Sequence, residues 1–280
     1  MSMSVNTNLF SLNAQRNLSK SQSSLSTSMQ RLSSGLRINS AADDAAGLAI
    51  SERMNSQVRG MNVAIRNAND AISLAQTADG ALASVGDSLQ RMRELAVQAA
   101  NATNSGSDKD SLNQEFQQLG SEITRVLGGT TFNGATILGA SAGALTFQVG
   151  ANTTTNDSIT VTTTNMTTDA SITAVTSAVI DSTVTTTAAI NTVIDNIDAA
   201  INDVNSQRAI FGASQNRFNA VVSNLQSSVE NQSAARSRIT DADFAAETAN
   251  MSRSQILQQA GTAMVAQANQ LPQSVLKLLQ

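Results

Sequence analysis

Few residues in this 280-residue chain could carry out chemistry. It has no histidine and no cysteine, which removes the commonest general base and metal ligand, a thiolate nucleophile and a disulfide framework. Two pairs of carboxylates stand close in sequence, Asp43 with Asp44 and Asp241 with Asp243. Both pairs fall at expected helix starts, where carboxylates stabilise the positive end of the helix dipole. We therefore expect no catalytic residue, no metal site and no cofactor, and hence no enzyme.

The amino-acid composition limits the classes of binding partner that we expect. The chain is 41% hydrophobic but only 2% aromatic, with 14% charged residues and a net charge of −4. A weakly acidic chain does not favour nucleic acid or an anionic membrane surface, and no apolar run approaches the ~18 residues of a membrane span. The N-terminus has no basic region followed by an apolar one, so no signal peptide is expected. We expect no nucleic-acid or membrane partner, and either a cytosolic location or export by a route that reads no such signal.

A long helix with an apolar seam is predicted between residues 54 and 99. Apolar residues recur there at alternating steps of three and four, the spacing of a helix that packs along another helix. Such a helix is far longer than the ordinary ~11–12 residues, and its seam needs a cover. The seam positions are Met54, Val58, Met61, Ile65, Ala68, Ile72, Ala75, Ala78, Leu82, Val85, Leu89, Met92, Ala96 and Ala99.

The predicted cover is a second long helix with the same spacing, over residues 190–235. Arg208 and Gln215 interrupt its seam, and we interpret them as seam-edge residues or setters of the helix register. A shorter helix over residues 108–127, capped by Ser107 or Asp108, follows a brief polar turn and should fold back antiparallel on the first.

The middle of the chain changes to a period of two. Asn133-Gly134 is a hairpin signal, and alternating apolar residues around 145–149 and 159–161 predict short paired strands. Residues 162–187 are rich in Thr, Ser and Ala, a composition typical of surface loop or weak strand. The Thr- and Ser-rich stretch 152–187 could carry O-linked glycans or be a plain solvated tip.

The two ends of the chain predict a second helix pair. Residues 4–35 carry a weak apolar seam among many serines, which are mediocre helix formers, so this segment should be helical only when packed. Gly35 is the expected stop, and Ser40 the expected cap of the next helix. A last helix, capped by Thr240 or Asp241, extends over 242–279 with a seam of Leu257, Ala260, Met264, Ala268, Leu271, Val275 and Leu278.

These elements nest within one another. The fold class is mainly α: a long antiparallel coiled-coil helical bundle with a small β-hairpin region and discontinuous, nested domains. Residues 1–40 with 237–280 form the inner terminal-helix domain. Residues 41–236 form a three-helix rod domain, in which about 130–187 supply hairpins and a short variable loop.

Several sequence motifs within this pattern resemble those of bacterial flagellin. The likeness covers about 1–140 and 190–280, and only some fifty low-complexity residues separate the two parts, so the chain resembles a minimal flagellin without large outer domains. A metal-dependent peptidase insertion needs His in H-E-x-x-H, which this sequence lacks. The matching stretches are RLSSGLRINSAADDAAGLAISERM (31–54), LQRMRELAVQAAN (89–101), TFNG (131–134), QNRFNAVVSNL (215–225), SRITDADFAAE (237–247) and QAGTAMVAQANQLPQSVLKLL (259–279).

The resemblance implies a subunit that polymerises into the filament of the bacterial flagellum. Half-covered seams at both ends agree, because heterologous contacts that do not close give filaments. The alternatives are a monomeric coiled-coil bundle and a hook–filament junction protein of the same architecture; the motifs at 37–47 and 270–279 favour flagellin itself. The expected polymerisation residues are Leu9, Leu12, Leu25, Leu32, Leu257, Met264, Leu271, Val275 and Leu278.

The resemblance also implies partners and a location. They are the flagellar export channel, a chaperone at the C-terminal helix, the filament cap and hook-junction proteins, and an extracellular place in the flagellum. A host flagellin-sensing Toll-like receptor is a further partner. By motif, its contact positions fall on Gln90, Arg91, Leu95 and Glu115, and we expect Arg91 and Leu95 to share the outer face of the long helix.

Overall fold

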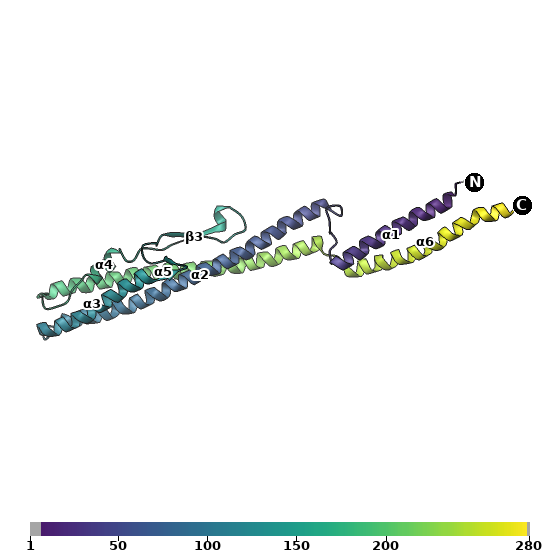
Figure 1. The fold of residues 1–280 in the computed structure, drawn as a ribbon. Helices are drawn as coiled ribbons and strands as arrows, with labels where there is room; N and C mark the ends of the chain where they lie inside the picture. Colours follow the sequence, from purple (N-terminus) through teal and green to yellow (C-terminus); the bar gives the residue numbers. More distant parts are fainter. Residues whose placement is uncertain (1–6, 279–280) are drawn as a thin grey trace. The chain divides into compact units, whose positions relative to one another are not determined.

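The computed structural model describes residues 7–278, and the side chains of residues 7–270. Its architecture confirms the predicted fold class of long helices with two small antiparallel sheets (Figure 1). The helices are α1 (Leu9–Ser34), α2 (Ala45–Ala99), α3 (Gly106–Gly129), α4 (Ala170–Thr176), α5 (Thr187–Thr240) and α6 (Phe244–Leu278), with a 3₁₀ turn η1 (Thr155–Asp157). The strands are β1 (Thr131–Phe132), β2 (Ala135–Thr136), β3 (Ala144–Gln148) and β4 (Ser158–Thr162).

The chain divides into two compact units that nest in the sequence. The terminal unit comprises Met1–Ser56 and Glu230–Gln280, and the central unit comprises Gln57–Val229. The functional domain division at residues 40 and 237 stays a prediction. Each unit is described by itself.

The core of the central unit lies along α2. The predicted seam is fully buried from Leu82 to Ala99, and Ile72 packs at its margin. Additional residues, Leu74 and Leu95 among them, are buried beside the seam. A helix that packs against several partners buries a wider apolar stripe than a two-helix seam, and in this unit the core also draws on α3, α5 and both hairpins.

Ion pairs fix the antiparallel pairing of α2 with α5. The Arg93 Nε atom lies 2.7 Å from an oxygen of Asp198, and the Arg208 Nε atom lies 2.8 Å from an oxygen of Asp79. Later residues of α5 therefore meet earlier residues of α2. Arg208 lies at the edge of the core, as its interruption of the seam predicts.

The cap of α3 differs from the predicted one. Ser105 precedes the helix, and its hydroxyl accepts a hydrogen bond from the Asp108 amide at 3.2 Å, while Asp108 accepts from the Ser105 amide at 2.9 Å. This reciprocal capping box satisfies two backbone donors at once. The prediction of Ser107 or Asp108 as the cap is wrong because Asp108 acts from the first turn.

The hairpins are confirmed. Asn133 and Gly134 have φ of 50° and 82°, the left-handed values that a two-residue hairpin turn requires. In the second hairpin Phe147 faces Ile159 across the antiparallel pair. The prediction of loop or weak strand after residue 162 is wrong for α4, which Asp169 caps. The buried side chains of Ile172 and Val175 hold this short helix on the core, a tertiary effect that composition does not report.

The terminal unit contains the antiparallel pair α1 and α6 (Figure 1). Gly35 ends α1 in the left-handed conformation, with φ of 72°, as predicted. The other predicted caps are wrong. Asp44, rather than Ser40, accepts from the Gly47 amide at 2.8 Å to cap α2, and Asp243, rather than Thr240 or Asp241, accepts from the first amides of α6.

The most buried residues between α1 and α6 are small or polar. Ser11 and Ser28 of α1 and Ser254 and Ala268 of α6 are buried. A Cβ atom at Gly261 would lie 3.2 Å from Leu18 Cδ1, so the helices approach closely there. The predicted α6 seam is wrong at Leu257 and Met264, whose side chains are exposed, and correct at Ala268, whose side chain is buried. The face of α6 that contacts α1 is therefore offset by about one residue around the helix from its most apolar face.

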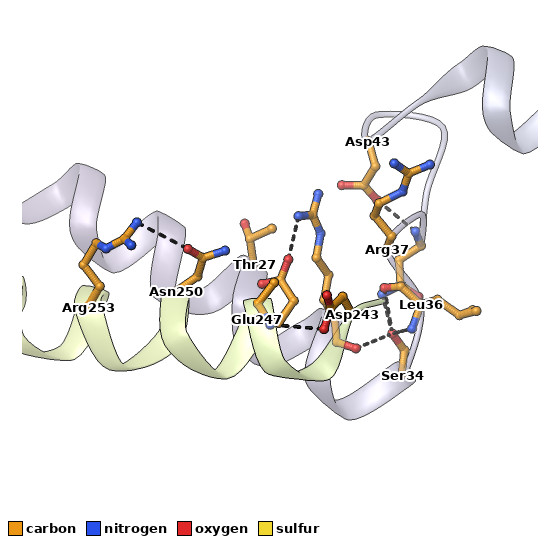
Figure 2. Close-up of polar contacts among 12 residues, drawn as sticks. Thr27, Ser34, Leu36, Arg37, Asp43, Asp243, Glu247, Asn250 and Arg253 are labelled. Atoms are coloured by element: carbon orange, nitrogen blue, oxygen red, sulfur yellow. Dashed lines mark hydrogen bonds and ion pairs between the residues drawn. The ribbon is translucent and has the colours of Figure 1, made fainter. Parts of the chain in front are cut away.

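The connectors of the terminal unit are joined by backbone hydrogen bonds. The Arg37 amide donates to the Thr240 carbonyl at 2.7 Å, and the Ala242 amide donates to the Gly35 carbonyl at 2.9 Å. The Arg37 guanidinium also donates to the Ile239 carbonyl at 2.7 Å. Ile239 lies in the last turn of α5, where a positive charge stabilises the negative end of the helix dipole. Figure 2 shows Leu36 and Arg37 close to Asp243 at the start of α6.

Candidate interaction surfaces

Large apolar side chains are exposed along α1 and α6, and we call this set the assembly surface. These side chains are 48–68% exposed, whereas their counterparts in the central unit form a buried core. Contiguous exposed apolar surface marks interaction sites. The members of the assembly surface are Leu9, Phe10, Leu12 and Met29 of α1 and Phe244, Ile256, Leu257 and Met264 of α6.

The predicted polymerisation residues fall into three groups. Leu9, Leu12, Leu257 and Met264 are exposed and belong to the assembly surface. Leu25 and Leu32 are half-buried within the terminal unit. Leu271, Val275 and Leu278 have side chains outside the described residues. The list of predicted polymerisation residues missed Phe10, Met29, Phe244 and Ile256. Phe10 and Phe244 could have been noticed as two of only seven aromatic residues in the chain.

A groove opens between the two helices on one flank of the pair, and we call it the apolar groove. Its volume is about 420 Å³. Phe10 and Leu18 contribute from α1, and Leu257, Met264 and Ala268 contribute from α6. Small seam residues leave this space open because they do not fill the gap that large knobs would fill in a coiled coil.

The predicted receptor positions lie on α2 and α3 of the central unit. The structure brings Arg91 and Glu115 together: Arg91 Nε donates to Glu115 Oε1 at 2.8 Å, and Arg91 Nη1 donates to Glu94 Oε2 at 2.8 Å. The hydrogen bonds that Arg91 donates to Glu115 and then to Glu94 raise the pKa of Arg91 above its ordinary value. Gln90 is exposed beside them. These residues form a solvated charged cluster.

Leu95 is the exception among these positions. Its side chain is 1% exposed and belongs to the core of the central unit. The prediction that Leu95 shares the outer face with Arg91 is wrong, because α2 buries a stripe wide enough to include the position before Ala96. Leu95 therefore contributes no exposed surface to the charged cluster.

The acidic pairs serve local structure. Asp43 accepts hydrogen bonds from the amides of Asn39 and Ser40 at 3.0 and 2.9 Å. The bonds from Ser40, followed by the Asn39 amide, lower the pKa of Asp43. Among the described residues, no group of three or more acidic side chains is arranged to hold a metal ion.

None of the helices in the described part of the chain is long and apolar enough to cross a membrane.

Comparison with known proteins agrees with this architecture. The family model for the bacterial flagellin N-terminal helical region matches residues 5–143, and the model for the C-terminal helical region matches residues 194–279. Flagellin of Halalkalibacterium halodurans is 46% identical over 277 residues, covering 99% of this chain and all of that protein. Flagellin of Bacillus subtilis is 42% identical over 305 residues, with 99% and 100% coverage.

A solved structure shares the fold alone. It is of a protein provisionally assigned as flagellar hook-associated, from Vibrio parahaemolyticus, with a TM-score of 0.58, 13% identity, and coverage of 71% of this chain and all of that one.

These matches, with the nested long helices, define a structural protein. The chain belongs to the bacterial flagellin family, the subunits of the flagellar filament. Its short central region makes it a minimal member of that family.

Proposed function

We propose that this chain polymerises into a flagellar filament outside the cell, and that the assembly surface on α1 and α6 makes the contacts between copies. The exposure of eight large apolar side chains on two adjacent helices supports this proposal. Full burial of such a side chain stabilises a complex by about 1.5–3 kcal/mol. A surface that matches a different surface on the next copy produces an open helical polymer.

A full-length double variant tests this proposal. L257D with M264D places two charges on exposed positions, so the monomer should fold as the wild type does. Buried carboxylates without partners are costly, and we expect no filaments in seeded assembly seen by negative-stain electron microscopy. V179D, which charges an exposed position of the central unit, is the matched control. Filaments of normal length from L257D/M264D would refute the assigned surface.

Export and its helpers form a further part of the proposal. The chain would pass unfolded through the flagellar export channel, with a chaperone on α6 before assembly and with cap and hook-junction proteins at the ends of the filament. The exposed apolar side chains of α6 support a chaperone, because they need cover before export. Co-purification of a chaperone with wild type but not with L257D/M264D would distinguish this use of α6.

Recognition by a host Toll-like receptor is a second proposed role of the monomer. The exposed ion pair between Arg91 and Glu115, with Gln90 beside it, supports this proposal, since Arg is enriched at binding hot spots. We expect R91A to reduce receptor-reporter activation strongly, with R125A, on the exposed Arg125–Glu122 pair, as control. Equal activation by R91A and wild type would refute the assignment. Filament contacts on the same face would make the monomer the active form.

A hook–filament junction protein is the alternative. The fold shared with a hook-associated protein permits it, but the 46% identity over nearly the whole chain is to a flagellin. Seeded growth separates the two, because a filament subunit adds without limit and a junction protein stops after a short collar.

A further inference from the structure

A second groove continues the apolar groove along the same flank of α1 and α6, and we call it the polar groove. Its volume is about 400 Å³, and Leu257 lines both grooves. The α1 positions that line them, from Phe10 to Arg31, follow helical spacing on one face. A partner seated in the apolar groove would therefore also cover the polar one. The polar groove is lined by Ser23, Ser24, Thr27, Ser28 and Arg31 of α1 and Glu247, Asn250, Arg253 and Ser254 of α6, besides Leu257.

Several hydrogen-bond donors in the polar groove lack an acceptor. Arg31 donates to Glu247 at 3.1 Å through Nη1, but its Nε atom is buried without a partner. Ser28 and Ser254 are each 6% exposed, and among the described residues their hydroxyls have no hydrogen-bond partner. Figure 2 shows Arg253, Asn250, Thr27 and Glu247 in succession along the two helices.

Arg253 has no carboxylate partner in the part of the chain that the structure describes. Its recorded polar contact is a long one, 3.4 Å from Nη1 to Asn250 Oδ1. Helices α1 and α6 together contain one acidic residue, Glu247, which Arg31 already occupies. The helix pair therefore cannot neutralise Arg253 from its own residues.

If the polar groove is buried between copies, an Arg253 without a carboxylate partner destabilises the contact. An unpaired guanidinium taken out of water is strongly destabilising unless a carboxylate and further hydrogen bonds compensate it. The chain does carry exposed carboxylates that make no ion pair, such as Glu52 and Glu230 of the terminal unit. A neighbouring copy can therefore supply the missing charge.

We propose that the polar groove receives an acidic side chain from a second copy of this chain, which pairs with Arg253 and accepts from the Ser28 and Ser254 hydroxyls. This contact rests on the proposed function and deepens it. The apolar groove supplies affinity, and the charge pair fixes the register in which copies dock, because charge complementarity gives specificity and suppresses misaligned contacts.

Critical concentrations of seeded assembly test the charge. Arg253 is exposed in the monomer, so its substitution should not affect folding, as circular dichroism will verify. Loss of one partner of a buried charge pair corresponds to about 30-fold or more in affinity. We expect R253E to raise the critical concentration by about that factor, R253K to stay near wild type, and R16Q, an exposed α1 arginine outside both grooves, to change little.

Zero-length cross-linking identifies the partner atom. The chain has only Lys20, Lys109 and Lys277, so R253K introduces a distinct amine. A carbodiimide activates a carboxylate, the amine attacks it, and an amide forms as the carbodiimide leaves as a urea. With filaments mixed from isotope-labelled and unlabelled copies, we expect position 253 to be joined to an Asp or Glu of another copy, in filaments but not in monomers.

Several results would overturn the contact. One is an R253E critical concentration within twofold of wild type; another is cross-linking of position 253 only within its own chain. Inorganic phosphate that abolishes the cross-link while filaments persist would show that a free oxyanion occupies the groove instead. If wild type and R16Q both fail to form filaments, the proposed function itself falls, and this contact falls with it.

Discussion

Leu95 shows how one buried side chain constrains the interpretation of a surface. It follows Arg91 by four residues on α2, and its side chain is part of the central core. Replacement of a buried Leu by Ala removes apolar contacts and leaves a cavity. We therefore expect L95A to lower the free energy of unfolding by about 2–5 kcal/mol, measured by urea denaturation.

The control for Leu95 is Arg91, whose side chain is half exposed. R91A should leave the free energy of unfolding close to that of the wild type, as is usual for exposed ion pairs. A wild-type stability for L95A would contradict the assigned burial. Any loss of receptor signalling in L95A must therefore be compared with its stability, whereas a loss in R91A reports on the surface.

Asp43 gives a pH dependence with a defined sign. Its pKa is lowered from 3.8 by hydrogen bonds from Ser40 and Asn39. A carboxyl whose pKa is lower in the folded state contributes stability above its unfolded pKa, and that contribution is lost as the pH falls through the folded pKa. The connector should therefore keep its order down to about pH 4 and lose it below.

The Ser40 amide reports this titration by NMR, because it donates directly to Asp43. We expect its chemical shift to titrate with an apparent pKa below 3.8, and the titration to vanish in D43N. An apparent pKa at or above 3.8 would show that the hydrogen bonds do not favour the charged form.

At the scale of the element, two glycines of α2 have opposite expectations. Gly80 is exposed with open space around a Cβ position, whereas a Cβ at Gly60 would lie 2.8 Å from the Ala151 Cβ. G80A should stabilise the central unit by about 0.5–1 kcal/mol through helix propensity. G60A should lose that gain or destabilise, because the loop at Ala151 must move. Equal thermal shifts for the two variants would contradict the close approach.

The same scale shows what the sequence could and could not predict. Periodicity located the long helices and hairpins, because burial along α2 and across Phe147 and Ile159 follows hydrophobicity. It failed for the α1–α6 contact, where Ser28, Ser254 and Gly261 permit close approach and Leu257 and Met264 remain outside. A pattern of apolar residues does not distinguish a seam within the chain from a surface meant for another copy. Helix α4 was not predicted because it contains only two core residues, Ile172 and Val175, which are too few to show a helical periodicity.

At the scale of the whole molecule, the two units have different chemistry. The central unit buries most of its large apolar residues in a core of its own. The terminal unit leaves several comparable residues exposed on α1 and α6, and the most buried residues between those helices are small or polar. This contrast supports the central proposal, that the terminal helices make the contacts with other copies.

Removal of the terminal helices tests that claim most directly. Variants that lack residues 1–35 or residues 245–280 keep the central unit and its core. In seeded assembly followed by negative-stain electron microscopy, we expect long uniform filaments from the full chain. We expect only helical, monomeric protein from either truncation. Filaments formed by either truncated protein would contradict the account.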